Sequence, residues 1–217
     1  MQNNKLVVFD LDGTLIDSVP DIAYSINVML EKFGHPQKSI AEITQMIGNG
    51  ARNLVIRSID QKLSDKEIDV RLEFYNAHYT SSGSPKTKVF DGVKEMLFEL
   101  KKRGYKLAIL TNKPQMTTDE VYKNHLQDVG FDAVVGQHVG MKIKPDPTML
   151  VKIMEDLGVE KQNTYFVGDG EPDAQIAQNA GVKGISELWG YRTKEQLEKV
   201  GATTFAKTPT DLLKLIK

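Results

Sequence analysis

The chain has 217 residues, of which 40% are hydrophobic and 26% are charged, and these proportions are ordinary for a folded globular protein. They exclude a disordered or fibrous protein, and the absence of cysteine excludes disulfides, thiolate-bound zinc, iron–sulfur clusters and every cysteine nucleophile. With 28 Lys and Arg against 29 Asp and Glu, the formal charge is −1, so no bulk field draws the chain to nucleic acid or to an anionic membrane.

After Met1 the N-terminal segment is polar until Leu6, where an apolar run of four residues begins and extends to Phe9. This run is too short for a signal peptide or a membrane span, and no other apolar run approaches the roughly 18 residues that a span requires. We therefore expect a cytoplasmic protein without a membrane or nucleic-acid partner. The β-branched and aromatic run Leu6–Phe9 is typical of a strand buried on both faces of a parallel sheet.

Residues 17–85 contain no strand-like run, and three or four amphipathic helices follow one another there instead. Ser39 with Glu42, and Ser64 with Glu67, have the spacing of a capping box, which predicts a helix after each serine. The turn-rich residues 81–85 end the last of these helices. We predict a small all-helical domain over residues 17–85, inserted after the first strand.

From residue 86 onward, short apolar runs alternate with segments of helical periodicity. One predicted helix begins after Asp91 and ends at Gly104, and another begins at Pro147 and ends at Gly158. The predicted strands cover residues 106–111, 133–135, 164–167 and 182–185. The alternation predicts an α/β fold, a doubly wound, Rossmann-like parallel sheet built from residues 1–16 and 86–217.

Two acids follow the first predicted strand directly, in the sequence Asp10-Leu11-Asp12-Gly13-Thr14. Ligands of parallel α/β sheets gather at the carboxyl ends of the strands, so both acids emerge where a site is expected. Acids at positions i and i+2 of a chain that leaves a strand can point toward one locus, and Gly13 permits a tight backbone turn. Such a pair can divide nucleophilic attack and proton transfer between its members.

Further strand ends supply groups of complementary chemistry. Thr111 and Asn112 offer a hydroxyl and an amide, and Lys144 offers a fixed positive charge. Asp169 and Asp173 add two more acids at the start of a predicted helix.

The four acids at these strand ends bring four negative charges against the single positive charge of Lys144, which leaves a net charge of −3. So many carboxylates do not all ionise in a dry cleft without a cation, and a hard divalent ion with oxygen ligands meets this need. Mg²⁺ usually keeps waters and completes its shell with a substrate phosphate, which suits a site with few direct carboxylate ligands. The sequence therefore favours Mg²⁺ as the cofactor.

The order of these motifs resembles the haloacid dehalogenase superfamily, and the resemblance covers essentially the whole chain. The motifs that carry it are Asp10-x-Asp12-Gly13-Thr14, Thr111, Lys144 and Gly168-Asp169-x-x-x-Asp173. The helical domain is similar to the cap domain of that superfamily. Two further segments resemble its phosphoglycolate phosphatase branch, namely Thr111-Asn112-Lys113-Pro114 and Trp189-Gly190-Tyr191-Arg192. The resemblance implies a phosphoric monoester hydrolase, a monomer or homodimer, that acts on a small phosphorylated metabolite.

The resemblance also implies a role for each motif residue. Asp10 would attack phosphorus to give an aspartyl-phosphate that water hydrolyses, and Asp12 would act as acid and base, holding a proton when substrate binds. Thr111 and Lys144 would hold the phosphoryl oxygens, with Asn112 as a further substrate-binding residue. Mg²⁺ would lie between Asp10, the backbone carbonyl of Asp12 and Asp169, while Asp173 would orient these ligands through another group or through water.

Substrate choice would come from the cap, and the segment Gly48-Asn49-Gly50-Ala51-Arg52 is our candidate for the loop that faces the substrate. Backbone amides at Gly50, the Asn49 side chain and the Arg52 guanidinium would meet a small carboxylate there. The same segment is also consistent with a plain helix end and the start of the next helix. Gly170 departs from the pattern, because many relatives have Ser or Thr at this position, and we expect a modest change in metal affinity.

Three alternatives share part of this chemistry. A receiver domain of a signalling protein also holds an aspartyl-phosphate with clustered acids, Thr and Lys, but it is shorter, has no helical insert and places its phosphoacceptor on a later strand. A sugar-phosphate mutase of the same superfamily would share all the core motifs and differ in its cap. Pyrophosphate or a nucleotide would replace phosphoglycolate as substrate without a change in the core, whereas a dehalogenase typically lacks an acid at the position of Asp12.

Overall fold

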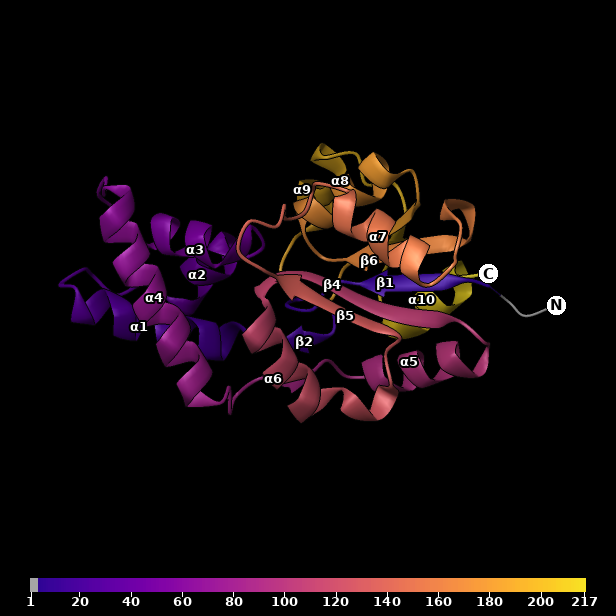
Figure 1. Cartoon of the computed structure of the whole chain (residues 1–217), viewed down its shortest axis with the longest axis horizontal. Helices are drawn as coiled ribbons and strands as arrows, with labels where there is room; N and C mark the ends of the chain where they lie inside the picture. The colour runs from indigo at the N-terminus through magenta and orange to yellow at the C-terminus, as the bar shows by residue number, and fades with distance from the viewer. Residues whose placement is uncertain (1–3) are drawn as a thin grey trace.

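The computed structural model describes residues 4–217, so residues 1–3 of the predicted core segment lie outside the described part of the chain. Four helices lie together at one end of the molecule, and a sheet with helices on both faces occupies the rest (Figure 1). Within residues 4–217, no helix has the length and apolar character that a membrane crossing demands.

The main sheet has six strands in the order β5-β4-β1-β6-β7-β8, and every neighbouring pair is parallel. Its strands are β1 (Leu6–Phe9), β4 (Lys106–Pro114), β5 (Ala133–Gln137), β6 (Thr164–Gly168), β7 (Lys183–Glu187) and β8 (Phe205–Ala206). β1 lies between β4 and β6, with Leu6 opposite both Lys106 and Thr164. The predicted doubly wound parallel sheet is confirmed, because the strand order runs outward from β1 in both directions.

Both faces of the sheet are covered, as a parallel sheet requires. α7 (Thr148–Asp156) and α8 (Glu171–Ala180) lie on one side of the sheet, while α5 (Val93–Lys102) and α6 (Gln115–His125) lie on the other (Figure 1). Along β1, Val7 and Phe9 belong to one apolar cluster and Leu6 and Val8 to the opposite one, because successive strand residues alternate between faces. The remaining elements are α9 (Lys194–Lys199), α10 (Pro209–Leu215) and the 3₁₀ turns η1 (Gln127–Val129) and η2 (Lys161–Asn163).

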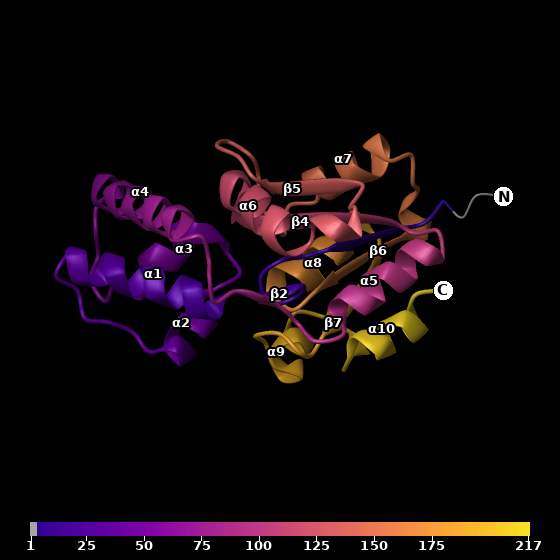
Figure 2. The same cartoon turned by 90° about the horizontal axis from the view of Figure 1, so that it is seen from below.

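The helical bundle consists of α1 (Val19–Lys32), α2 (Ile40–Met46), α3 (Gly50–Ser58) and α4 (Asp65–Ser82). It has an apolar cluster of its own, which includes Ile26 and Tyr79, and it stands apart from the sheet in a second view (Figure 2). Both predicted capping boxes are present, with Ser39 and Ser64 as the N-caps of α2 and α4.

A small two-stranded antiparallel sheet lies where the chain enters and leaves the bundle. Its strands are β2 (Ile16–Asp17) and β3 (Lys88–Val89), and Ile16 pairs with Val89. The sequence did not predict these two strands. They tie the two connections between bundle and core to each other.

Candidate active site

The predicted polar residues converge because the strands that carry them are neighbours in the sheet. Asp10 follows β1, Thr111 and Asn112 lie in β4, and Asp169 follows β6, so all of these side chains lie at the same edge. Each is at least nine-tenths buried, as is Lys144 from the loop between β5 and α7. The structure thus brings together the core residues that the sequence selected.

Lys144 is the centre of the ionic contacts at the strand ends. Its Nζ lies 2.7 Å from Oδ1 of Asp10 and 2.7 Å from Oδ1 of Asp173. Asn112 fixes the Lys144 backbone, since Oδ1 of Asn112 accepts from the Lys144 N–H at 2.9 Å and its Nδ2 donates to the Lys144 carbonyl at 3.2 Å. Asn112 Nδ2 also donates to the Gly48 carbonyl at 3.1 Å, so this side chain connects the core to the bundle.

Three acids form a compact buried cluster. Carboxylate oxygens of Asp10, Asp169 and Asp173 all lie within 4.8 Å of one another. Asp169 accepts from the Thr14 hydroxyl at 3.3 Å and from the Tyr191 N–H at 2.9 Å, which fixes both of its oxygens. A Cβ at position 13 would overlap the Asp169 carboxylate, so the close approach of that turn requires Gly13.

The acid cluster is short of positive charge. Burial, and then the neighbouring Asp173, raise the pKa of Asp10 to about 7, although Lys144 opposes this shift. Burial, followed by Asp173 and Asp10, raises the pKa of Asp169 to about 8. Oδ1 of Asp10 has Lys144 as its partner, and Lys144 is shared with Asp173. An all-oxygen donor set with a deficit of positive charge fits Mg²⁺.

The side chain of Asp12 lies apart from that cluster and faces a cavity. Its Oδ1 accepts from the Ser18 hydroxyl at 2.5 Å and lies 3.1 Å from Nζ of Lys113. Sequence reasoning did not assign a role to Lys113, a buried residue of β4 whose Nζ also donates to the Tyr79 hydroxyl at 3.0 Å. Burial lowers the pKa of Lys113, but Asp12 and Tyr79 outweigh burial and raise it above its usual range.

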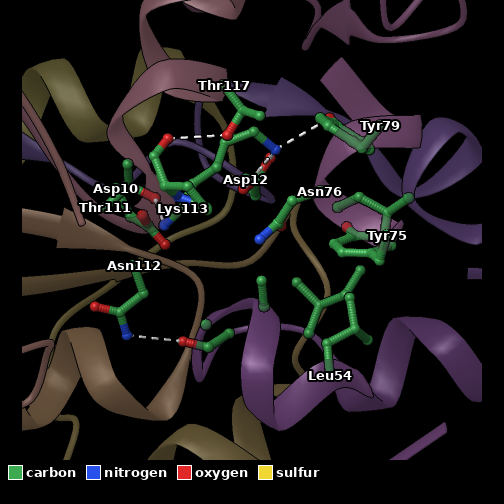
Figure 3. Close-up of a pocket in the computed structure, with 16 residues that line it drawn as sticks. Asp10, Asp12, Leu54, Tyr75, Asn76, Tyr79, Thr111, Asn112, Lys113 and Thr117 are labelled. Atoms are coloured by element: carbon green, nitrogen blue, oxygen red, sulfur yellow. Dashed lines mark hydrogen bonds and ion pairs between the residues drawn. The ribbon is translucent and has the colours of Figure 1, made fainter. Parts of the chain in front are cut away.

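The cavity lies between the core and the bundle and is lined by residues of both. The core contributes Asp10, Asp12 and Thr111, which lie on the opposite side of the space from the bundle residues Leu54 and Tyr75 (Figure 3). The strand ends and the bundle therefore form one continuous site.

Only part of the predicted bundle loop reaches the cavity. Gly48 and Gly50 line it, whereas Asn49 and Arg52 do not. Arg52 is directed toward α4, where its guanidinium binds Asp65 at 2.7 Å and also contacts Asp69. The structure does not bring Asn49 and Arg52 to the other candidate residues.

Sequence reasoning also missed Glu187, the last residue of β7. Its side chain is fully buried, and its Oε2 accepts from the N–H groups of Trp189 at 2.7 Å and Gly190 at 3.1 Å. Burial, and then the nearby Asp169, raise its pKa well above the usual value. The signal was available, because Glu187 lies two residues beyond the end of a predicted strand, at the same edge as the other acids.

The comparisons with known proteins agree with this geometry. The sequence profile of the haloacid dehalogenase-like hydrolases matches residues 7–186. Phosphoglycolate phosphatase 1 of Pseudomonas aeruginosa is 34% identical over 214 residues, which cover 96% of this chain and 78% of that protein. The phosphoglycolate phosphatase of Vibrio parahaemolyticus is 33% identical over 221 residues, or 99% of this chain and 97% of that one.

Solved structures resemble the chain over its full length. A predicted phosphoglycolate phosphatase from Haemophilus somnus superimposes with a TM-score of 0.90 at 30% identity and covers 100% of both chains. CbbY from Rhodobacter sphaeroides, solved with phosphate, has a TM-score of 0.80 over 96% of both chains. Its sequence is only 16% identical, so this likeness concerns the fold alone.

Proposed function

The chain belongs to the haloacid dehalogenase-like hydrolases, and on this premise we propose that it is a Mg²⁺-dependent phosphatase that hydrolyses a small, phosphoglycolate-like phosphate monoester. That it is a phosphoric monoester hydrolase follows from the family and from its phosphoglycolate phosphatase relatives. The observation that carries the finer proposal is the buried cluster of Asp10, Asp169 and Asp173 around Lys144.

Asp10 is our proposed nucleophile. One of its carboxylate oxygens forms a bond to phosphorus while the bond from phosphorus to the substrate alcohol breaks, which leaves an aspartyl-phosphate that water then hydrolyses. Lys144 supports this role because it holds Oδ1 of Asp10 at 2.7 Å. Thr111 lines the same cavity, and together with Lys144 it would bind the oxygens of the transferred phosphoryl group.

Asp12 is our proposed acid and base. Its carboxylate lines the cavity from the next turn of the chain, two residues beyond the nucleophile. It would give a proton to the departing alkoxide and later take one from the attacking water. Its contacts with Ser18 and Lys113 orient the carboxylate without removing it from the cavity.

Asp10, Asp169 and the backbone carbonyl of Asp12 would hold Mg²⁺. The ion would supply the positive charge that the buried carboxylates and a bound phosphate need. Asp173 would act on this group of ligands through Lys144, to which its Oδ1 is bound at 2.7 Å.

The bundle would act as a cap that selects the substrate and excludes water. Residues of α1, α3 and α4 line the cavity above the strand ends, where the alcohol part of a substrate would lie. We keep residues 17–85 as the proposed limits of this cap, with residues 1–16 and 86–217 as the core. The cytoplasmic location and the monomeric or homodimeric state stay predictions from the sequence.

A panel of phosphate esters tests this function. Phosphate release from phosphoglycolate, pyrophosphate, nucleotides and hexose phosphates is to be measured with Mg²⁺ and with EDTA. We expect turnover of phosphoglycolate that requires Mg²⁺ and exceeds that of the other compounds. Conversion of a hexose phosphate to its isomer without phosphate release would instead identify a mutase, and release that is indifferent to EDTA would refute the metal assignment.

A further inference from the structure

Lys113 is a buried cation whose only part in the reaction described above is to orient Asp12. Its side chain extends from β4 into the cavity, which Thr111, two residues earlier, also lines (Figure 3). Only 8% of the residue is exposed. Burial of an ammonium group is costly unless it is paired, so a lysine in this position calls for an explanation.

The partners of Lys113 place it on the side of the site where the alcohol of the substrate leaves. Its Nζ lies 3.1 Å from the proposed acid and base, Asp12, whereas Lys144 binds the nucleophile Asp10. The two lysines thus divide the site, with Lys144 beside the phosphoryl group and Lys113 beside the leaving oxygen. A charged group attached next to that oxygen would lie within reach of Lys113.

Arg52, the other cationic candidate for substrate binding in the bundle, forms its ion pairs outside the cavity. Among the residues that line the cavity, Lys113 is the single Lys or Arg. Arg52 pairs with Asp65 and Asp69 on α4, away from the cavity. An anionic group on the substrate alcohol therefore has one cationic partner in this part of the chain.

The ammonium of Lys113 is shared between the core and the bundle. Its three N–H donors meet both carboxylate oxygens of Asp12, at 3.1 Å and 3.3 Å, and the Tyr79 hydroxyl at 3.0 Å. Tyr79 and Asn76 both come from α4, and Asn76 lines the same cavity as Lys113 (Figure 3). A bound carboxylate would take over one of the Lys113 donors that Asp12 holds, and the Asn76 amide offers a further donor in the cavity.

We propose that Lys113 recognises the anionic group carried by the alcohol part of the substrate, and that it, rather than Arg52, sets the preference for a carboxylate-bearing phosphate monoester. The proposal rests on the phosphatase function and specifies how that site chooses its substrate.

The test compares two esters of similar size, phosphoglycolate and 2-hydroxyethyl phosphate, which has a neutral hydroxymethyl group in place of the carboxylate. We expect the unaltered enzyme to prefer phosphoglycolate by about tenfold or more in kcat/KM. Lys113→Met is expected to reduce this ratio at least tenfold, mainly through the KM for phosphoglycolate. Loss of the contact with Asp12 would lower kcat for both esters alike, so it cancels in the ratio.

Three further variants and one further substrate ensure that each result either supports or contradicts the proposal. Lys38→Met removes a bundle lysine that pairs with Asp60 outside the cavity and should leave the ratio unchanged. Tyr79→Phe removes one partner of Lys113 and should lower the preference for phosphoglycolate by a smaller factor than Lys113→Met. This variant tests the proposal if Lys113→Met fails to fold. A loss of preference confined to Arg52→Met, or an unaltered enzyme without preference, would overturn the proposal. Absence of Mg²⁺-dependent hydrolysis of p-nitrophenyl phosphate would instead refute the phosphatase function itself.

Discussion

Asp10 is the side chain on which the proposed chemistry depends most directly. Asp10→Asn keeps the shape of the residue but replaces the nucleophilic oxygen, so we expect phosphate release to fall by roughly 10³-fold or more. The same change removes one of three buried acids that repel one another, so the melting temperature should stay the same or rise. Enzyme assays and thermal melts check both expectations.

Asp156→Asn is the matched control for Asp10→Asn, because Asp156 is an exposed aspartate of α7 whose partner is Lys152. It should leave turnover and the melting temperature nearly unchanged. Substantial phosphate release by Asp10→Asn would remove Asp10 from its assigned role.

The buried acids also predict how stability depends on pH without metal. Asp10 and Asp169 have pKa values of about 7 and about 8 in the folded chain, against 3.8 as the ordinary value. Between about pH 4 and pH 8 the folded chain therefore binds more protons than the unfolded chain, so the free energy of unfolding falls as pH rises. The maximum slope is about 1.4 kcal/mol per pH unit for each such group.

Urea unfolding at pH 5, 6, 7 and 8 in EDTA measures this slope. Saturating Mg²⁺ should flatten it, because a bound cation stabilises the ionised carboxylates, and Asp10→Asn should make it shallower in EDTA. A free energy of unfolding that rises over this range in EDTA would contradict the raised pKa values.

Asp10, Thr111 and Asp169 could be predicted as candidate site residues because each directly follows or ends a recognisable strand. Lys113 was missed because it lies where β4 shifts its register against β5, between Leu110 and Pro114, so regular alternation does not describe this part of the strand. The predicted strand ended at residue 111, and β4 continues to Pro114, so the pattern stopped too early to include Lys113. The ion pairs of Arg52 depend on how α3 packs on α4, which the spacing of motifs along the chain does not describe.

At the scale of elements, the turn between β6 and α8 depends on the absence of a side chain at Gly168. A Cβ at this position would overlap Cγ of Asp173, which is held in the first turn of α8. Gly168→Ala should therefore displace Asp173 from Lys144 and reduce kcat/KM by roughly 10²-fold. It should also destabilise the fold by about 1–3 kcal/mol.

Gly170→Ala is the comparison variant in the same turn. A Cβ there would lie 3.2 Å from Oδ2 of Asp173, and the backbone of Gly170 is extended, so alanine fits after a small adjustment. We expect kcat/KM within about threefold of the unaltered enzyme, since the adjustment is of tenths of an ångström. Equal losses in both alanine variants would show that the turn tolerates no side chain anywhere and that the Asp173 contact is not the cause.

The elements with strong local signals were predicted well. The capping boxes at Ser39 and Ser64 define the starts of α2 and α4, and the apolar runs define five of the six parallel strands. β2, β3 and β8 have only two residues each, too few for any periodicity, and they form because the surrounding structure brings their partners together.

At the scale of the whole molecule, the sequence predicted a sheet domain and a helical domain but not how the two pack against each other. That arrangement depends on a few long-range polar contacts, such as those of Asn112 with Gly48 and of Lys113 with Tyr79. The partners are 64 and 34 residues apart in the sequence, so their pairing follows only from the folded arrangement. The cavity exists because these contacts hold the bundle over the strand ends.

Arg192 makes the most extensive of these contacts. It follows β7 in the core, and its guanidinium donates to the backbone carbonyls of Thr44 at 3.1 Å, Gln45 at 3.4 Å and Ile47 at 2.6 Å in the bundle. Its Nε pairs with Glu171 at 3.0 Å, which fixes the side chain from the core. These carbonyls at the C-terminal end of α2 have no further helical turn to bond to, so Arg192 satisfies them.

Arg192→Met should therefore loosen the bundle on the core. Loss of the buried donors is expected to cost about 1–3 kcal/mol and to speed hydrogen exchange in residues 47–50, where the chain lines the cavity. Because residues 47–50 face the bound substrate whatever its alcohol part, kcat/KM should fall by a similar factor for phosphoglycolate and 2-hydroxyethyl phosphate. Lys113→Met, in contrast, should lower kcat/KM more for phosphoglycolate than for the other ester. Arg57→Met is the matched control, since Arg57 donates to the Met46 carbonyl from within the bundle. If Arg192→Met and Arg57→Met change hydrogen exchange and kcat/KM equally, then the stability of α2 controls the site, and the attachment of α2 to the core does not.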